Sequence, residues 1–202
     1  LLGHDLIHYV KKESNGMNRN FVTDPRLRAR HQGFSLIELM ITIVVAAILL
    51  AIAIPSFRTL ILSNELTTTT NEWVTAVNVA RSEAIKRSAG VVVCGAGGNQ
   101  GGANDLSNGC AGNLGEVRAF QAGTTTVTVV RAALEIPDSV NLASTQSLRF
   151  GATGIGRLPT ATAPYTGIAA DISSPDLGGE NHRCVRVISG TTVTTDSDTV
   201  CN

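Results

Sequence analysis

One segment constrains this chain more than any other: the 21 residues from Phe34 to Ile54 carry a single charge, that of Glu38. A helix rises about 1.5 Å per residue, so this segment would span about 30 Å, the thickness of the hydrocarbon core of a bilayer. A cleaved signal peptide has a shorter apolar core, of about 7–15 residues, followed by a site of small residues. The sequence after Ile54 does not offer that site. We therefore predict a membrane-spanning helix at 34–54 that stays with the protein.

The charges on either side of this segment predict its orientation. Of the 16 Lys and Arg residues, six precede Phe34 alongside three acids, whereas ten basic and 13 acidic residues follow from Phe34 onward. The positive-inside rule then keeps residues 1–33 in the cytoplasm and sends the remainder outward. The first methionine is Met17, and we expect translation to start there.

Glu38 needs an explanation, because an acid costs roughly 2.5–3.5 kcal/mol at mid-bilayer and is usually functional there. If the basic leader, residues 1–33, is cut off after Gly33, Phe34 gains a positively charged amine beside the membrane. The Glu38 carboxylate of a neighbouring subunit would then pair with that amine. The alternative is an uncleaved anchor that tolerates one acid.

The stretch "GFSLIELM" (Gly33 to Met40), followed by its apolar run, resembles the type IV prepilin signature. The resemblance implies that a prepilin peptidase cuts between Gly33 and Phe34 and that Phe34 is then N-methylated. It also implies that Glu38 directs assembly into a helical filament. Pro55 falls where this family has a helix-kinking proline.

The segment 55–89 predicts an amphipathic continuation of the helix. Its apolar residues recur at helical spacing, and Gly90 supplies a stop signal after two cations. These apolar residues are Trp73, Val77, Ala80, Ala84 and Ile85. The stretch "NEWVTAVNVARSEAIKR" (Asn71 to Arg87) closely resembles the helix of minor pilins and pseudopilins of the FimT and type II secretion protein H family.

From residue 90 to 202 the pattern changes to short β-rich runs between turns, such as "VVVC", "EVRAFQ" and "RCVRVIS". A long helix followed by such strands predicts an α+β fold, with the helix packed on an antiparallel β-sheet head. Within this head the family resemblance rests on scattered features, among them "LRFGATG" (Leu148 to Gly154).

Four cysteines, Cys94, Cys110, Cys184 and Cys201, all follow the apolar segment. None forms a CxxC pair, and an even number in an exported domain indicates disulfides. Three pairings are possible. We expect Cys94–Cys110 and Cys184–Cys201, each closing a loop of about 17 residues that stabilises the fold by roughly 3 kcal/mol.

The chain shows no pattern typical of an enzyme or of a cofactor site. The Gly-rich loop after Cys94 lacks both the dinucleotide fingerprint and the Gly-Lys-Ser/Thr ending of a P-loop. His182, the one histidine outside the leader, is expected in an exposed loop, so a two-His metal site is disfavoured. Asp171, Asp176 and Glu180 lack an EF-hand pattern. We expect no catalytic residue, no metal and no cofactor.

We therefore expect a structural minor pilin or pseudopilin, in the inner membrane with its head in the periplasm, assembled into a type IV pilus or a type II secretion pseudopilus. Its expected partners are prepilin peptidase, other pilins or pseudopilins, and the inner-membrane assembly platform. Two alternatives stay open: a DNA-binding tip subunit for DNA uptake, and an anchored periplasmic domain unrelated to filaments.

The resemblance to FimT also bears on DNA. DNA-binding members have a Gly-Arg-x-Arg motif near the C-terminus, but the corresponding stretch here, Gly190 to Val193, has no arginine and is followed by Asp196 and Asp198. Affinity for nucleic acid depends on how many phosphates are neutralised. We expect weak DNA binding or none, with Arg183 and Arg186 as the remaining candidate contacts and Arg157 as a third if it lies nearby.

Overall fold

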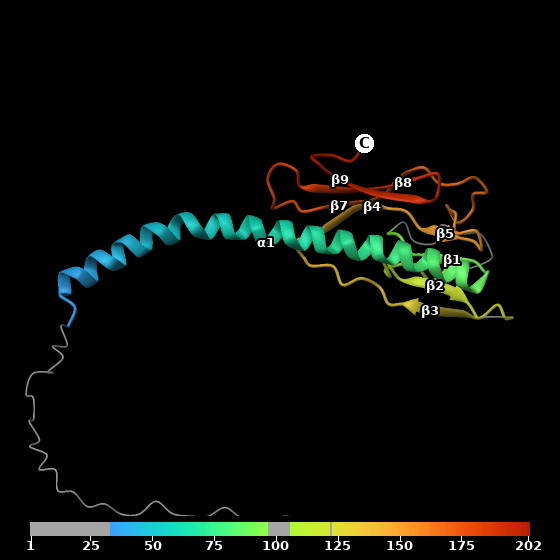
Figure 1. Cartoon of the computed structure of the whole chain (residues 1–202), viewed down its shortest axis with the longest axis horizontal. Helices are drawn as coiled ribbons and strands as arrows, with labels where there is room; N and C mark the ends of the chain where they lie inside the picture. Colours follow the sequence, from blue (N-terminus) through green and yellow to red (C-terminus); the bar gives the residue numbers. More distant parts are fainter. Residues whose placement is uncertain (1–32, 97–105, 122) are drawn as a thin grey trace, which may run out of the picture. The chain divides into compact units, whose positions relative to one another are not determined.

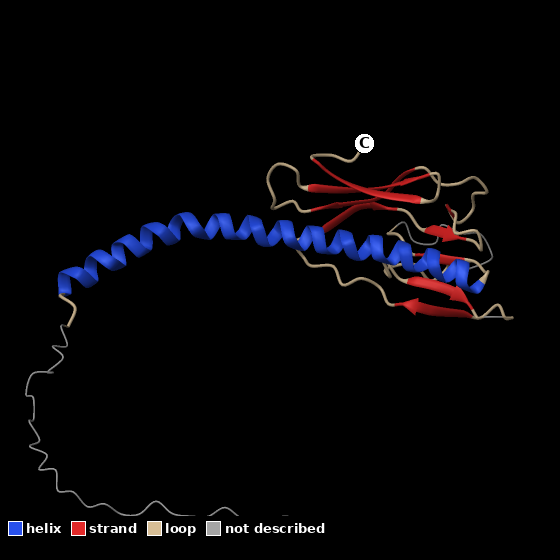
Figure 2. Cartoon of the chain, viewed as in Figure 1, coloured by secondary structure: helices blue, strands red, loops and turns tan. Residues whose placement is uncertain are grey.

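The computed structural model describes residues 33–96, 106–121 and 123–202, and it divides after Val45 into two compact units. One long helix, α1 (Leu36–Arg87), is followed by nine short strands (Figure 1). Figure 2 shows that strands and loops make up the rest of the described chain. The α+β, pilin-like fold class is confirmed. The basic leader, apart from Gly33, and residues 97–105 of the Gly-rich loop lie outside the described residues.

The helix α1 runs through Pro55 without a break and ends in a Schellman motif. Ser88 takes the left-handed conformation (φ 50°), its N–H donates to Ile85 O, and the N–H of Ala89 donates to Ala84 O. These two bonds satisfy carbonyls that the end of a helix leaves open. The expectation that Gly90 ends the helix is corrected, because Ser88 occupies the position that glycine usually takes.

The head contains two antiparallel sheets. The first has the strand order β3-β2-β1-β5-β6 and the second the order β4-β7-β8-β9. The first sheet consists of β1 (Val91–Val93), β2 (Val117–Phe120), β3 (Val127–Arg131), β5 (Leu148–Phe150) and β6 (Gly156–Arg157). The second consists of β4 (Asn141–Thr145), β7 (Gly167–Ser173), β8 (His182–Ile188) and β9 (Thr192–Asp198).

The main core lies where the later half of α1 meets both sheets. Every third or fourth residue of this half is buried, as the helical spacing predicts. The buried apolar residues of the helix are Leu66, Trp73, Ala76, Val77, Ala80 and Ala84. They pack with residues of the first sheet, including Val91 and Phe150, and of the second, including Ile172 and Val185. Ile85, expected on this stripe, is instead 49% exposed.

Backbone hydrogen bonds connect the two sheets at one corner of the head. The N–H of Gly156 in β6 donates to Gly190 O in the β8–β9 turn, at 2.7 Å. Tyr165, just before β7, donates its N–H to Gly156 O and accepts from the N–H of Gly190. These bonds hold the β8–β9 turn against the edge of the first sheet.

Two strands are absent from the sequence expectations. β4, "NLAST", is polar and exposes three of its five residues, so it has no apolar alternation. β6 has only two residues, Gly156 and Arg157, in a stretch that reads as a turn. Both are edge strands. Their strand structure depends on pairing with a neighbouring strand more than on their own composition.

Candidate assembly segment and head surface

Gly33 and Phe34 lie immediately before α1, and no described residue constrains them. A Cβ added at Gly33 would meet no described atom within 4 Å, and Phe34 is 80% exposed. The fold of this chain therefore requires neither a glycine at 33 nor a large apolar residue at 34.

Glu38 lies in the first turn of α1 and is exposed. No described residue forms an ion pair with it. The dipole of the helix N-terminus favours an acid by about 0.3–1 kcal/mol. An acid costs roughly 2.5–3.5 kcal/mol at mid-bilayer and less toward the headgroups. Within the described chain, this dipole is the one favourable interaction found for the Glu38 carboxylate.

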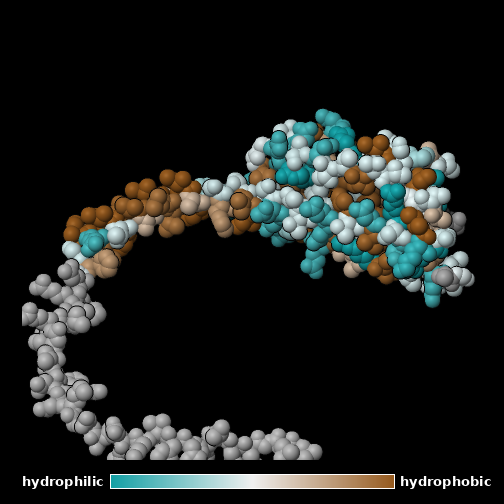
Figure 3. Space-filling view, viewed as in Figure 1, coloured by the Kyte–Doolittle hydropathy of each residue, from teal (hydrophilic) through white to brown (hydrophobic). Residues whose placement is uncertain are grey.

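The first part of α1 has the length and apolarity of a membrane span. None of its most apolar stretch is buried in the described chain. Figure 3 shows hydrophobic side chains covering this part of the helix. Pro55 follows the apolar run and is exposed within the helix. The described chain thus carries one helix suited to a single-pass membrane anchor.

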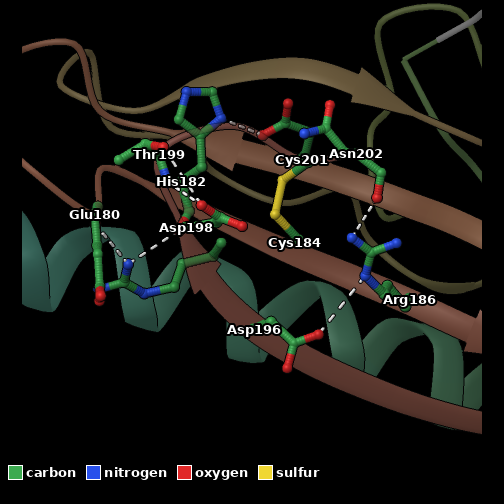
Figure 4. The surroundings of a disulfide bond; sticks show 11 residues. Glu180, His182, Cys184, Arg186, Asp196, Asp198, Thr199, Cys201 and Asn202 are labelled. Carbon is green, nitrogen blue, oxygen red and sulfur yellow. Dashed lines mark hydrogen bonds and ion pairs between the residues drawn. A yellow bond between two sulfur atoms is a disulfide. The ribbon is translucent and has the colours of Figure 1, made fainter.

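The structure contains both disulfides that the loop lengths favoured, Cys94–Cys110 and Cys184–Cys201. The first is buried with Val92 and Leu106 in a small second core. The second connects β8 to the segment that follows β9 (Figure 4). Cys94 directly follows β1 of the first sheet, whereas Cys184 lies within β8 of the second.

Arg183 and Arg186 both lie on β8, but neither guanidinium is free. Figure 4 shows Arg186 with its partners. Arg183 Nη1 donates to the carbonyls of Glu180 and His182, at 2.9 and 3.1 Å. Arg186 donates to Asn202 O and lies 3.7 Å from the carboxylate of Asp196. The candidate DNA contacts are therefore partly engaged within the head.

The stretch that corresponds to the DNA-binding motif, Gly190 to Val193, comprises the end of the β8–β9 turn and the first two residues of β9. Gly190 is buried with φ +66°, and Val193 packs against the main core. Thr191 O accepts a 2.6 Å hydrogen bond from Arg81 Nη1 of α1. Arg81 is thus a cation in direct contact with this turn, and sequence reasoning missed it. The two residues are 110 positions apart, so no local pattern could have indicated the contact.

Arg157, the third candidate contact, lies in β6 of the other sheet. The bond between Gly156 and Gly190 brings its strand next to the β8–β9 turn. Its Nε donates to Thr162 O at 2.7 Å, so this guanidinium also has a partner within the head.

His182 is not in a loop, and that expectation is corrected. It begins β8, and its Nδ1 lies 2.6 Å from Asp171 Oδ1 of β7. The two side chains are only 19% and 13% exposed. Three acids, Asp171, Asp176 and Glu180, were considered as cation ligands from the sequence. Among the described residues, Asp171 is the one that lies in a group of three potential metal ligands. Asp176 instead lines a hollow beside Pro55 and Arg58.

Taken together, a long apolar helix that continues into the core of a head with two antiparallel sheets defines a pilin-like subunit. The family model described as type II transport protein GspH matches residues 69–191, more than half of the 202 residues. The chain therefore belongs to the GspH family of pilin-like minor pseudopilins. A second model, the prokaryotic N-terminal methylation motif, matches residues 28–54. No match was found among curated proteins or solved structures.

Proposed function

We propose that this protein is a structural minor subunit that prepilin peptidase processes and that then assembles into a filament with other pilin-like subunits. One observation carries the proposal: Glu38 lies without a described partner at the start of an exposed apolar helix, inside the matched methylation motif. The description of the matched family favours a type II secretion pseudopilus over a type IV pilus as the filament. A role of this kind needs no catalytic residue.

The processing step would cut the Gly33–Phe34 bond and methylate the new amine of Phe34. A glycine at 33 has no structural role in the described chain, which supports a role in recognition by the peptidase. Cutting creates the cation that Glu38 lacks. In a bundle of parallel helices, the Phe34 amine of one subunit would lie beside the Glu38 carboxylate of the next. The positive amine and the negative carboxylate would then offset each other's desolvation cost.

The proposed topology is a single pass through the inner membrane with residues 1–33 on the cytoplasmic side. The basic leader supports this orientation through the positive-inside rule. Two disulfides in the head support an oxidising compartment such as the periplasm. The proposed partners are prepilin peptidase, neighbouring pseudopilins or pilins, and the inner-membrane assembly platform.

Mass analysis of the N-terminus tests the proposal. Protein extracted from membranes of cells with an active prepilin peptidase should begin at a methylated Phe34. The Gly33→Leu variant should keep its leader, because a bulky side chain obstructs the peptidase. Gly178→Leu, where an added side chain meets open space in the head, is the matched control and should be processed. An intact leader on the wild-type protein in such cells would contradict the proposed function.

A further inference from the structure

Three potential metal ligands converge on the second sheet. One ligand atom each from Asp171, His182 and Cys201 lies within 4.8 Å of the other two. This is the single group of its kind found in residues 33–96, 106–121 and 123–202. The Sγ of Cys201 is bonded to Cys184, so a fourth potential ligand adjoins the group.

The register of the strands explains the convergence. Asp171 of β7 lies directly opposite Cys184 of β8, and side chains opposite each other share a face of a sheet. His182 precedes Cys184 by two positions on the same strand, so it shares that face as well. The disulfide then holds Cys201 over the same face (Figure 4).

We propose that, once the Cys184–Cys201 disulfide is reduced, these two cysteines bind one Zn²⁺ together with His182 and Asp171. Two thiolates, one imidazole and one carboxylate form a ligand set that suits tetrahedral zinc. From the usual zinc–ligand distances, ligand atoms in such a site lie about 3–4 Å apart. The widest separation therefore has to shorten by up to about 1 Å, whereas the 2.6 Å between His182 Nδ1 and Asp171 Oδ1 has to lengthen slightly.

The chemistry balances with a dithiol as reductant. The dithiol gives two electrons and two protons to the disulfide and becomes a disulfide itself, which leaves two protein thiols. Zinc then displaces the two thiol protons, and the proton between His182 Nδ1 and Asp171 moves to Nε2 of the same ring, which frees Nδ1 to bind the metal. The hydrogen bond between Asp171 and His182 already holds these two ligands together before the metal arrives. The two cysteines consequently either form the disulfide or bind zinc, and the redox state of their sulfurs decides which.

The test uses the full chain in detergent, with the metal alone as the probe. A phosphine serves as reductant because a dithiol would itself bind zinc; it takes the oxygen of water and leaves two hydrogens on the sulfurs. Competition with a chromophoric chelator should show one Zn²⁺ per reduced chain and none bound by the oxidised chain. Co²⁺ in place of Zn²⁺ should give the absorption of a tetrahedral thiolate complex.

Two variants examine the ligands. His182→Ala and Asp171→Asn should each weaken zinc binding by about tenfold or more, since even residues that only support a ligating histidine are worth 10–100-fold in metal affinity. Trp73, the single tryptophan, is fully buried, so its emission reports whether the reduced head stays folded. An unfolded-type emission after reduction, or equal zinc affinity in wild type and His182→Ala, would overturn the proposal.

The other disulfide is an internal control. Cys94 and Cys110 belong to no described group of three ligands. In the reduced protein, zinc should slow alkylation of Cys184 and Cys201 but not of Cys94 and Cys110, as measured by mass spectrometry of the peptides. Equal protection of both pairs would mean that zinc binds thiols without a preformed site, and the proposal would be wrong.

Discussion

At the scale of single residues, Glu38 is the side chain whose position the fold of one chain does not explain. It is exposed at the start of an apolar helix, and no described residue forms an ion pair with it. In the proposed filament, the Phe34 amine of a neighbouring subunit would be its partner. Replacing Glu38 should therefore impair filament assembly and leave folding and membrane insertion unchanged.

We predict that Glu38→Ala leaves membrane insertion and cleavage intact but strongly reduces incorporation into filaments. The variant loses the proposed partner of the Phe34 amine, while its helix becomes more apolar. Cross-linking to the major filament subunit measures the effect. Glu38→Gln, which keeps the shape without the charge, should fail as Glu38→Ala does. Wild-type cross-linking in both variants would remove the ion pair as the explanation.

Gly190 is a residue whose backbone conformation decides local stability. Its φ is +66°, and an added Cβ would clash with the carbonyl oxygen of Gly156. We predict that Gly190→Ala lowers the free energy of unfolding by about 2 kcal/mol or more, from backbone strain together with the clash. Gly178→Ala, with open space around the site, should be nearly neutral. Urea unfolding of the two variants makes the comparison, and equal midpoints would contradict this view of the turn.

At the scale of elements, Tyr165 connects the two sheets. Its backbone bonds Gly156 of β6 and Gly190 of the β8–β9 turn, and its hydroxyl donates to Ile168 O in β7 at 2.6 Å. Burial raises the pKa of its phenol above the usual value near 10. The neutral phenol is thus the form that the folded head favours.

We predict that Tyr165→Phe lowers the free energy of unfolding by about 1 kcal/mol at neutral pH, the usual worth of one hydrogen bond. Because the folded pKa is raised, the wild-type contribution is complete below the unfolded pKa of about 10 and is lost as the pH rises through the folded pKa. The difference between wild type and variant should therefore shrink above about pH 10. Unfolding measured across this range checks it, and a constant difference would contradict the assigned role of the hydroxyl.

At the scale of the whole molecule, the distribution of cations bears on nucleic-acid binding. Arg183 and Arg186 donate hydrogen bonds within the head, and Asp196 lies beside Arg186. Val193, at the position of the second motif arginine, packs against the core. The turn is therefore built for packing, and it carries none of the cations that would contact phosphates.

We predict that the head, from about Arg58 onward, binds DNA weakly or not at all. Nucleic-acid affinity rests on phosphates neutralised, and it falls steeply with salt. A gel shift at low salt measures it, with Arg183→Ala/Arg186→Ala as the comparison. Micromolar binding that weakens with salt and disappears in the double variant would show instead that these two arginines form a DNA site.

The sequence alone was sufficient for the features that depend on neighbours along the chain. The apolar run with Glu38, the helical spacing around Trp73 and the α+β class follow from periodicity and composition, and the structure and the family match confirm the class. The short loops between cysteines also favoured the pairing that the structure contains. These signals are local, so they can be recognised in the sequence without knowledge of the fold.

Only the tertiary structure decided what meets across the head. The contact of Arg81 with Thr191 joins residues 110 positions apart, and the group of Asp171, His182 and Cys201 comes from three separate segments. The edge strands β4 and β6 were likewise set by pairing with their neighbours and not by their own residues. These side chains are brought together by the register of the strands and by the packing of one sheet against the other. Neither of these can be read from a short stretch of sequence.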